Sequence, residues 1–188
     1  MAQTRRVMRI IAGSLRGRRL RAPSGEATRP TADRVRQALF DMLAHAPWAE
    51  NVLADARVLD GFAGSGALGL EALSRGAASA VFLEQSGAAR AALAANIAAC
   101  RMEARARVLA ADATRPPPGT PQTLILLDPP YGQGLLTPTL TALEAAGWLA
   151  PGALIAAELG RAEPLPPGLG PPLAERRHGA ARLAIWRR

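Results

Sequence analysis

The sequence predicts an α/β fold, an open and doubly wound sheet of mostly parallel strands behind a basic N-terminal extension. From residue 57 onward, short apolar runs alternate with stretches of helical periodicity, which is the pattern of repeated βα units. The run at residues 124–128 is continuously apolar, as expected of a central strand buried on both faces. A chain of 188 residues with 49% hydrophobic residues is long enough to bury one such core.

The first 50 residues are expected to form a hairpin followed by a helix. Residues 8–20 carry apolar runs interrupted by glycine and flanked by arginine, which favours a short twisted hairpin with a basic face. Thr31 is expected to cap a helix whose apolar positions recur at helical spacing. We expect this extension, residues 1–50, to pack on a single domain formed by residues 51–188.

The remaining elements alternate along the chain. Strands are expected over residues 57–60, 80–84, 107–112, 124–128, 153–159 and 181–186. Helices are expected over residues 67–75, 87–100 and 136–147. Residues 115–122 and 164–172 are proline-rich and predict surface loops. The last strand is expected to pair antiparallel with residues near Leu173, which would complete seven strands.

Positive charge is concentrated at the front of the chain. All 23 basic residues are arginines, and residues 1–36 hold ten of them against two acids, which accounts for the whole net charge of +8. This excess indicates a polyanionic partner, although a solvated charged hairpin is the alternative. Arg21 and Arg36 belong to this basic group, and its main candidates for contact with a polyanion are Arg9, Arg16, Arg18, Arg19, Arg29 and Arg34.

Composition argues against several classes of protein. A single cysteine, Cys100, excludes a disulfide framework, and with only two histidines it argues against a structural zinc site. No apolar run approaches the ~18 residues that would span a membrane. The basic start lacks the apolar stretch of a signal peptide. We therefore expect a cytoplasmic protein that uses neither a metal nor a membrane. We also expect it to be a monomer, although nothing in the composition bears on that.

A glycine-rich loop, Asp60-Gly-Phe-Ala-Gly-Ser-Gly-Ala-Leu-Gly69, follows the first strand. Such a loop lets a ligand approach the backbone and presents the amides of a helix N-terminus. Gly64, Gly66 and Gly69 match the dinucleotide pattern G-x-G-x-x-G. These glycines start four residues after the predicted strand ends, whereas a dinucleotide loop turns almost at once. Asp60 would also repel a pyrophosphate. A carboxylate suits S-adenosylmethionine, which carries a sulfonium and an ammonium and no phosphate. The alternative is a tight turn with a capping aspartate.

Two further acids end the next two predicted strands. Glu84 closes the second strand, where a carboxylate can accept hydrogen bonds from ribose hydroxyls. Asp112 closes the third strand, where it can accept from an adenine amino group. Either acid alone would be read as a solvated residue at a strand end. Because ligands bind at the carboxyl ends of strands in such sheets, the three acids together favour an adenosylmethionine site.

The tetrapeptide Asp128-Pro129-Pro130-Tyr131 follows the central apolar run. Its prolines fix φ and remove two backbone donors, which leaves rigid carbonyl acceptors. Asp128 and the carbonyl of Pro129 can accept the two hydrogens of an exocyclic amino group, and Tyr131 can stack on the base that carries it. The amino nitrogen of a nucleobase is a poor nucleophile, so positioning and charge stabilisation would supply most of the catalysis. The alternative is a proline-rich turn after a strand.

This tetrapeptide after a glycine-rich loop resembles the exocyclic-amino methyltransferases of DNA and RNA. Residues 9–20, 29–43 and 62–76 are similar to the bacterial RsmD family, whose members methylate N2 of one guanine in 16S ribosomal RNA. The resemblance covers nearly the whole chain. It implies a seven-stranded, Rossmann-like class I methyltransferase sheet, S-adenosylmethionine as the cofactor without a metal, and 16S rRNA as the partner, within the 30S subunit or an assembly intermediate.

The resemblance also assigns roles by position. It implies a donor site formed by Asp60, Ala63, Gly64, Ser65, Gly66, Glu84, Asp112 and Ala113. It implies catalysis by Asp128, Pro129, Pro130 and Tyr131, and contact with RNA by the basic extension. Gly61 and Gln85 depart from the family pattern, which at most affects cofactor affinity. The rival hypotheses are a DNA adenine-N6 methyltransferase, a nicotinamide-dependent oxidoreductase and a noncatalytic RNA-binding protein.

Overall fold

The computed structural model describes residues 8–23, 30–49 and 51–188, and the side chains of all of these except residues 30–32. Its helices are α1 (Pro30–His45), α2 (Ala67–Ser74), α3 (Gly87–Cys100) and α4 (Leu136–Ala145). Its strands are β1 (Arg57–Asp60), β2 (Ser79–Leu83), β3 (Ala106–Leu109), β4 (Gln122–Leu127), β5 (Leu149–Gly160), β6 (Ala174–His178) and β7 (Ala181–Arg187).

The strands form one seven-stranded sheet in the order β3-β2-β1-β4-β5-β7-β6. Strands β1 to β5 are parallel to one another, and β7 runs antiparallel to both β5 and β6. The predicted doubly wound, mostly parallel sheet is therefore confirmed, including the antiparallel pairing of the last strand with the segment just after Leu173.

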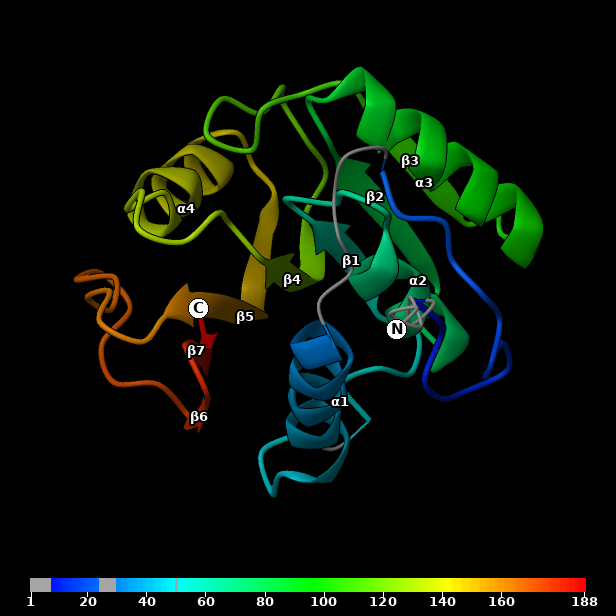
Figure 1. Cartoon of the computed structure of the whole chain (residues 1–188). Coiled ribbons are helices and arrows are strands. Elements are labelled where there is room, and N and C mark those ends of the chain that lie inside the picture. The colour runs from blue at the N-terminus through cyan, green and yellow to red at the C-terminus, as the bar shows by residue number, and fades with distance from the viewer. Residues whose placement is uncertain (1–7, 24–29, 50) are drawn as a thin grey trace, which may run out of the picture.

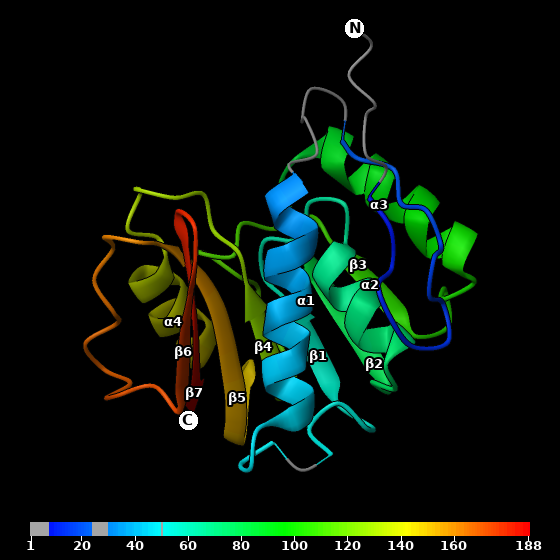
Figure 2. The same cartoon turned by 60° about the horizontal axis from the view of Figure 1, so that its bottom comes forward.

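Helices cover the two faces of the sheet unequally. In Figures 1 and 2, α1, α2 and α3 lie over one face and α4 lies over the other. Successive strand residues point to opposite faces, so Phe82 belongs to the core under the three helices and Leu83 to the core under α4. The link between β3 and β4 contains no helix, as its prolines predicted.

The segment at residues 8–20 turns back on itself but forms no regular strands. One isolated antiparallel bridge joins Arg9 and Arg19, and the N–H of Leu20 donates to the carbonyl of Met8 at 2.9 Å. Ile10 and Leu20 are buried in the core cluster beside the helices. The predicted reversal of the chain is confirmed, but the predicted paired strands of a hairpin are absent from this segment. The division of the chain at residue 50 stays a prediction.

Several boundaries differ from the predicted ones. Helix α1 begins at Pro30 rather than after Thr31, because the fixed φ of proline suits the first position of a helix. Strand β3 ends at Leu109, where the N–H of Ala111 turns back to the carbonyl of Leu109. Asp112 therefore lies in the loop after β3 instead of closing the strand.

Candidate active site

The carboxyl ends of the central parallel strands meet at one edge of the sheet. The register pairs Asp60, the last residue of β1, with Phe82 of β2 and Leu126 of β4. Glu84 and Asp128 each lie two residues beyond these partners, so both stand just past the same edge. The fold thus brings distant acids to the position where ligands bind in open α/β sheets.

The glycine-rich loop is tied to the strands on either side of β1. The N–H of Gly61 donates to the carbonyl of Leu126 on β4 at 2.9 Å. The N–H of Ala63 donates to the carbonyl of Leu83 on β2 at 3.1 Å. These bonds hold the loop across the edge of the sheet, between the acids and the tetrapeptide.

Two of the three patterned glycines are required by packing. Gly66 has φ 80°, and a Cβ there would lie 2.3 Å from Cδ1 of Leu93. A Cβ on Gly69 would lie 2.3 Å from the ring of Phe82. Gly64 differs, since a Cβ at this position would meet none of the described atoms within 4 Å. Gly66 therefore lets the start of α2 approach α3, and Gly69 lets α2 approach β2, whereas Gly64 borders open space.

Asp60 is buried, with 1% of its surface exposed. Its Oδ2 accepts a hydrogen bond of 2.9 Å from the N–H of Gly69, while Oδ1 has no partner among the described residues. Burial raises the pKa of Asp60 from 3.8 to about 7, the Gly69 N–H opposes that rise, and the charge of Glu84 adds to it. The predicted capping bond exists, but it leaves one buried oxygen to be satisfied.

Glu84 links the glycine-rich loop to the start of α3. Its carboxylate accepts from the N–H of Gly64 at 2.8 Å and from the N–H of Ser86 at 2.7 Å. Asp112 accepts from the N–H and the hydroxyl of Thr114, both at 2.8 Å, and these bonds hold its pKa below the usual range. Both carboxylates are half-buried at the same edge as Asp60.

The other residues expected at the donor site lie mainly inside the protein. Ala63, Ser65 and Ala113 are buried. The hydroxyl of Ser65 donates to Sδ of Met8 at 3.2 Å, so the loop also contacts the N-terminal segment. The half-buried Gly64, Glu84 and Asp112 are thus the surfaces that a ligand at this edge would meet first.

The tetrapeptide directly follows β4. Asp128 and Pro130 are exposed, and Pro129 is buried. Tyr131 is 38% exposed, and its hydroxyl donates to Oε1 of Glu158 on β5. A partly exposed ring can stack on a planar base, and the exposed Asp128 can accept from its amino group.

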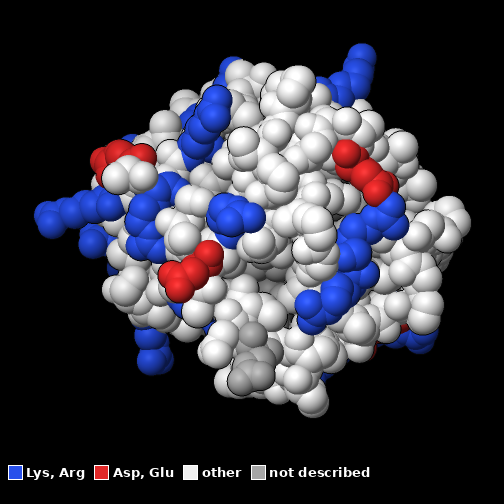
Figure 3. All heavy atoms as spheres, turned by 180° about the vertical axis from the view of Figure 1, so that it is seen from behind, with Lys and Arg blue, Asp and Glu red and all other residues white. Residues whose placement is uncertain are grey.

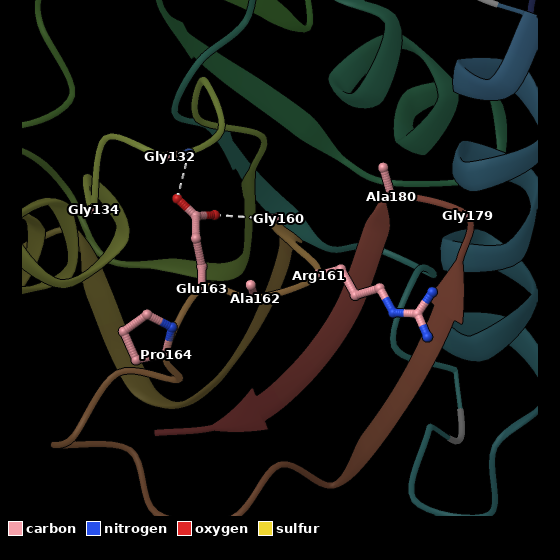
Figure 4. Close-up of a pocket in the computed structure, with 9 residues that line it drawn as sticks. All are labelled: Gly132, Gly134, Gly160, Arg161, Ala162, Glu163, Pro164, Gly179 and Ala180. Carbon is pink, nitrogen blue, oxygen red and sulfur yellow. Dashed lines mark hydrogen bonds between the residues drawn. The ribbon is translucent and has the colours of Figure 1, made fainter.

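A depression of about 770 Å³ opens behind the turn that follows Tyr131 (Figure 4). Its walls come from Gly132 and Gly134, from the turn after β5 and from the β6–β7 connection. Glu163 points from the turn after β5 toward Gly132 and accepts hydrogen bonds of 2.6 Å from the N–H groups of Gly132 and Gly160.

The basic extension divides into exposed and buried arginines. Five of the expected RNA contacts are exposed: Arg9, Arg16, Arg18, Arg19 and Arg34. The sixth, Arg29, lies outside the described residues. Arg36 is only 5% exposed, because its Nη2 donates to the carbonyl of Arg9 at 2.7 Å and to Oδ1 of Asp33 at 2.9 Å. Its inclusion in the basic group as a contact was therefore wrong.

Arginines also lie outside this segment. On the face seen from behind, basic side chains lie on both flanks of a mostly uncharged centre, with acidic side chains beside them (Figure 3). Three C-terminal arginines have partners: Arg182 donates to the carbonyl of Glu163, Arg187 to the carbonyl of Trp48, and Arg188 to Glu144.

Sequence reasoning missed three buried polar side chains that fasten the N-terminal segment. Glu71 of α2 accepts from the N–H groups of Ile11 and Ala12 at 2.7 and 3.0 Å. Ser74 donates to the carbonyl of Ala12 at 2.5 Å. In the sequence, these residues could have been noticed because each is a polar residue within an apolar stretch of predicted helix.

The third buried side chain, Asn96 of α3, lies between the N-terminal segment and the glycine-rich loop. Its Oδ1 accepts from the N–H of Arg21 at 2.7 Å, and its Nδ2 donates to the carbonyls of Arg21 and Ser65 at 2.9 and 2.8 Å. Asn96 is the one amide in an alanine-rich helix, and it joins the basic segment to the loop at the donor edge.

Neither a metal cluster nor a membrane span is found in the described part of the chain. No group of three or more histidine, cysteine, aspartate or glutamate side chains there is arranged to hold a metal ion. None of the helices in these residues is long and apolar enough to cross a membrane.

Comparison with known sequences finds relatives along most of the chain. The sequence model of the family described as "Conserved hypothetical protein 95" matches residues 8–187. Ribosomal RNA small subunit methyltransferase D of Escherichia coli (strain K12) is 46% identical over 153 residues, which are 80% of this chain and 74% of that protein. The protein of the same name from Haemophilus influenzae is 37% identical over 163 residues, with coverage of 84% and 81%.

Solved structures share the fold. The structure of yhhF from Escherichia coli superposes with a TM-score of 0.82 at 41% identity, and the match covers 96% of this chain and 97% of that one. An RNA methyltransferase from Salinibacter ruber, solved with S-adenosyl-L-homocysteine, superposes with a TM-score of 0.60 at 14% identity, covering 80% and 90%. At that identity the second match bears on the fold alone.

Proposed function

The chain belongs to the RsmD family of ribosomal RNA methyltransferases, and from this premise we propose that it transfers a methyl group from S-adenosylmethionine to N2 of one guanine in 16S rRNA. One observation carries the proposal. The register of β1 with β2 and β4 puts the glycine-rich loop, its acids and the Asp128–Tyr131 tetrapeptide at one edge of the sheet.

The donor side of the proposal is supported by charge. S-adenosylmethionine supplies an electrophilic methyl group on a cationic sulfonium. Asp60 offers a buried oxygen without a partner among the described residues, and Glu84 and Asp112 border the same edge. Gly64 leaves open space beside them. This acidic site suits a cation, whereas the pyrophosphate of a nicotinamide dinucleotide would be repelled.

The substrate side is supported by the tetrapeptide. The carboxylate of Asp128 and the carbonyl of Pro129 would accept the two amino hydrogens of the guanine, and Tyr131 would stack on its ring. The guanine nitrogen would have to lose a proton when it takes up the methyl group in place of the sulfonium, and the carboxylate of Asp128 would accept that proton. A base within an RNA helix would first be unstacked.

The remaining parts of the proposal concern partners. Exposed arginines of the N-terminal segment would hold the phosphate backbone of the rRNA, within the 30S subunit or an assembly intermediate. We propose that the protein acts as a monomer in the cytoplasm, where this substrate is found, and that it needs no metal.

The test is methyl transfer from labelled S-adenosylmethionine to 30S subunits, naked 16S rRNA and duplex DNA, offered separately. We expect label in rRNA as N2-methylguanine, and the 16S rRNA of a deletion strain should lack one such nucleotide by mass spectrometry. Label in DNA as N6-methyladenine would favour the adenine methyltransferase instead. Calorimetric binding of NADH without binding of S-adenosylhomocysteine would favour an oxidoreductase.

A further inference from the structure

We propose that two glutamates at the end of β5, Glu158 and Glu163, are positioning residues that hold the Tyr131 turn in the orientation needed to stack on the substrate base. This inference rests on the proposed function for its catalytic meaning. Its structural content, a turn held by two carboxylates, is independent of that function.

The turn after Tyr131 lies at the surface. Residues 131–134 are exposed, and Gly132 and Gly134 have φ of 74° and 62°, a region that glycine enters at little cost. A Cβ on either glycine would meet no described atom within 4 Å. The space beside these glycines is open, so the hydrogen bonds to the turn are the contacts whose removal can be tested there.

Glu163 supplies the backbone contact. Its Oε1 accepts from the N–H of Gly132, the residue after Tyr131, and its Oε2 accepts from the N–H of Gly160, both at 2.6 Å. One carboxylate therefore bridges the tetrapeptide turn to the end of β5, and Figure 4 shows it pointing across the depression toward Gly132. Hydrogen bonds to an ionised acceptor are about twice as strong as neutral ones.

The backbone of Glu163 is itself held by hydrogen bonds. Its N–H donates to the carbonyl of Gly160 at 3.0 Å, which closes a tight turn after β5. Its carbonyl accepts from Nη2 of Arg182 on β7. The side chain of Glu163 thus extends from a turn that is bonded to the sheet. It can therefore fix the exposed Tyr131 turn relative to the sheet.

Glu158 supplies the side-chain contact. It lies on β5 and accepts the hydroxyl hydrogen of Tyr131. Together the two glutamates constrain the tyrosine at its backbone end and at its ring end. A ring held at both ends can be placed parallel to a base before the base arrives, which is the role that positioning plays in such catalysis.

The experiment uses the fact that Tyr131 is the only tyrosine in the chain. Labelling with 3-fluorotyrosine therefore gives a single ¹⁹F resonance that reports on this turn. The full-length variants are Glu163→Ala, Glu163→Gln and Glu158→Gln. The matched control is Glu103→Gln, which removes an exposed carboxylate between α3 and β3. All are compared with and without S-adenosylhomocysteine.

We expect Glu163→Ala to shift or split the resonance and Glu163→Gln to shift it less, because glutamine keeps one acceptor oxygen. Glu158→Gln should shift it as well, and the control should not. If Glu163→Ala does not fold, the glutamine variant decides. A resonance that stays at the wild-type position in the Glu163 variants would overturn the proposal.

Activity gives the second readout. Turnover on rRNA should fall about tenfold or more in Glu163→Ala and less in Glu163→Gln. The Kd for S-adenosylhomocysteine should stay within about twofold of wild type, since neither glutamate lies in the expected donor site. A parallel loss of donor affinity, or unchanged turnover, would contradict a positioning role. If the wild-type protein methylates no rRNA, the proposed function fails, while the fluorine measurement still decides how the turn is held.

Discussion

The surroundings of Asp60 shift its pKa in opposite directions. The N–H of Gly69 at the start of α2 stabilises the carboxylate, whereas burial and the nearby charge of Glu84 favour the neutral acid. Burial dominates, and the pKa is raised to about 7. A cationic ligand at this edge would reverse the balance, since it would favour the ionised form.

The free energy of unfolding should therefore depend on Asp60 between pH 5 and pH 8. The folded protein holds a proton that the unfolded chain, with a pKa near 3.8, has released. This contribution to stability is fully present below that value and is lost as the pH rises through about 7. Denaturant unfolding without ligand should show a fall of about 2 to 3 kcal/mol from pH 5 to pH 8. The Asp60→Asn variant should not show this decrease in the free energy of unfolding. If the variant and the wild type have the same pH profile, the prediction about Asp60 is wrong.

Asp128 tests the catalytic assignment. Asp128→Ala removes the carboxylate that would receive the amino hydrogen, so methyl transfer should fall about a hundredfold or more. S-adenosylhomocysteine should still bind, because the expected donor residues lie at the end of β1, in the glycine-rich loop, just past β2 and in the loop after β3. Transfer rates with labelled donor and calorimetry on the same sample check both statements. Full residual activity would rule out the assignment.

At the scale of elements, the N-terminal segment and the glycine-rich loop are joined through helices. Residues 8–21 have backbone hydrogen bonds of their own, and buried groups on α2 and α3 add further bonds that tie the segment to these helices. Figure 2 shows the segment running beside these two helices. The basic segment is therefore held in place by side chains that belong to the sheet domain.

Asn96→Ala should loosen this attachment. It leaves the N–H and carbonyl of Arg21 and the carbonyl of Ser65 without their partner, which should cost about 2 kcal/mol or more. Trypsin cleaves after arginine, so cleavage at Arg16–Arg21 should become faster than in wild type. Gln85→Ala, which removes an exposed amide just before α3, is the control and should change neither quantity. Unchanged cleavage in Asn96→Ala would show that the segment is held by other contacts.

At the scale of the whole molecule, charge and chemistry occupy different parts of the chain. The net charge of +8 lies within residues 1–36, while the acids of the donor edge belong to the electrically balanced remainder. The structure refines this division, because Arg36 is buried, while Arg107, Arg176 and Arg177, which lie outside residues 1–36, are exposed. The exposed arginines of the N-terminal segment remain the proposed RNA contact.

Replacing Arg16, Arg18 and Arg19 by glutamine should weaken rRNA binding and flatten its salt dependence. Every arginine that no longer neutralises a phosphate should reduce the slope of log K against log salt by about 0.7 to 0.9. Donor affinity should not change. The control triple variant, with glutamine at Arg107, Arg176 and Arg177, removes the same charge from exposed positions on β3 and β6. An equal effect of both triples in filter-binding titrations would mean that only net charge matters.

The sequence by itself determined the order of the elements, the glycine-rich loop and the acids that follow the strands. These are local properties, since periodicity, turn residues and proline act within a few positions of one another. The parallel order then required Asp60, Glu84 and Asp128 to share one edge. Boundaries such as the end of β3 differed, because hydrogen bonding to neighbouring strands, and not local pattern, ends a strand.

Only the tertiary structure decided which polar residues support that edge. Glu71 meets Ile11 across 60 positions, Asn96 meets Arg21 across 75, and Glu163 meets Gly132 across 31. A polar residue in an apolar helix marks Glu71 and Asn96 as unusual, but no local pattern shows which distant backbone group each side chain meets. Their roles arise because buried backbone groups need partners, and folding determines which distant side chains can reach them.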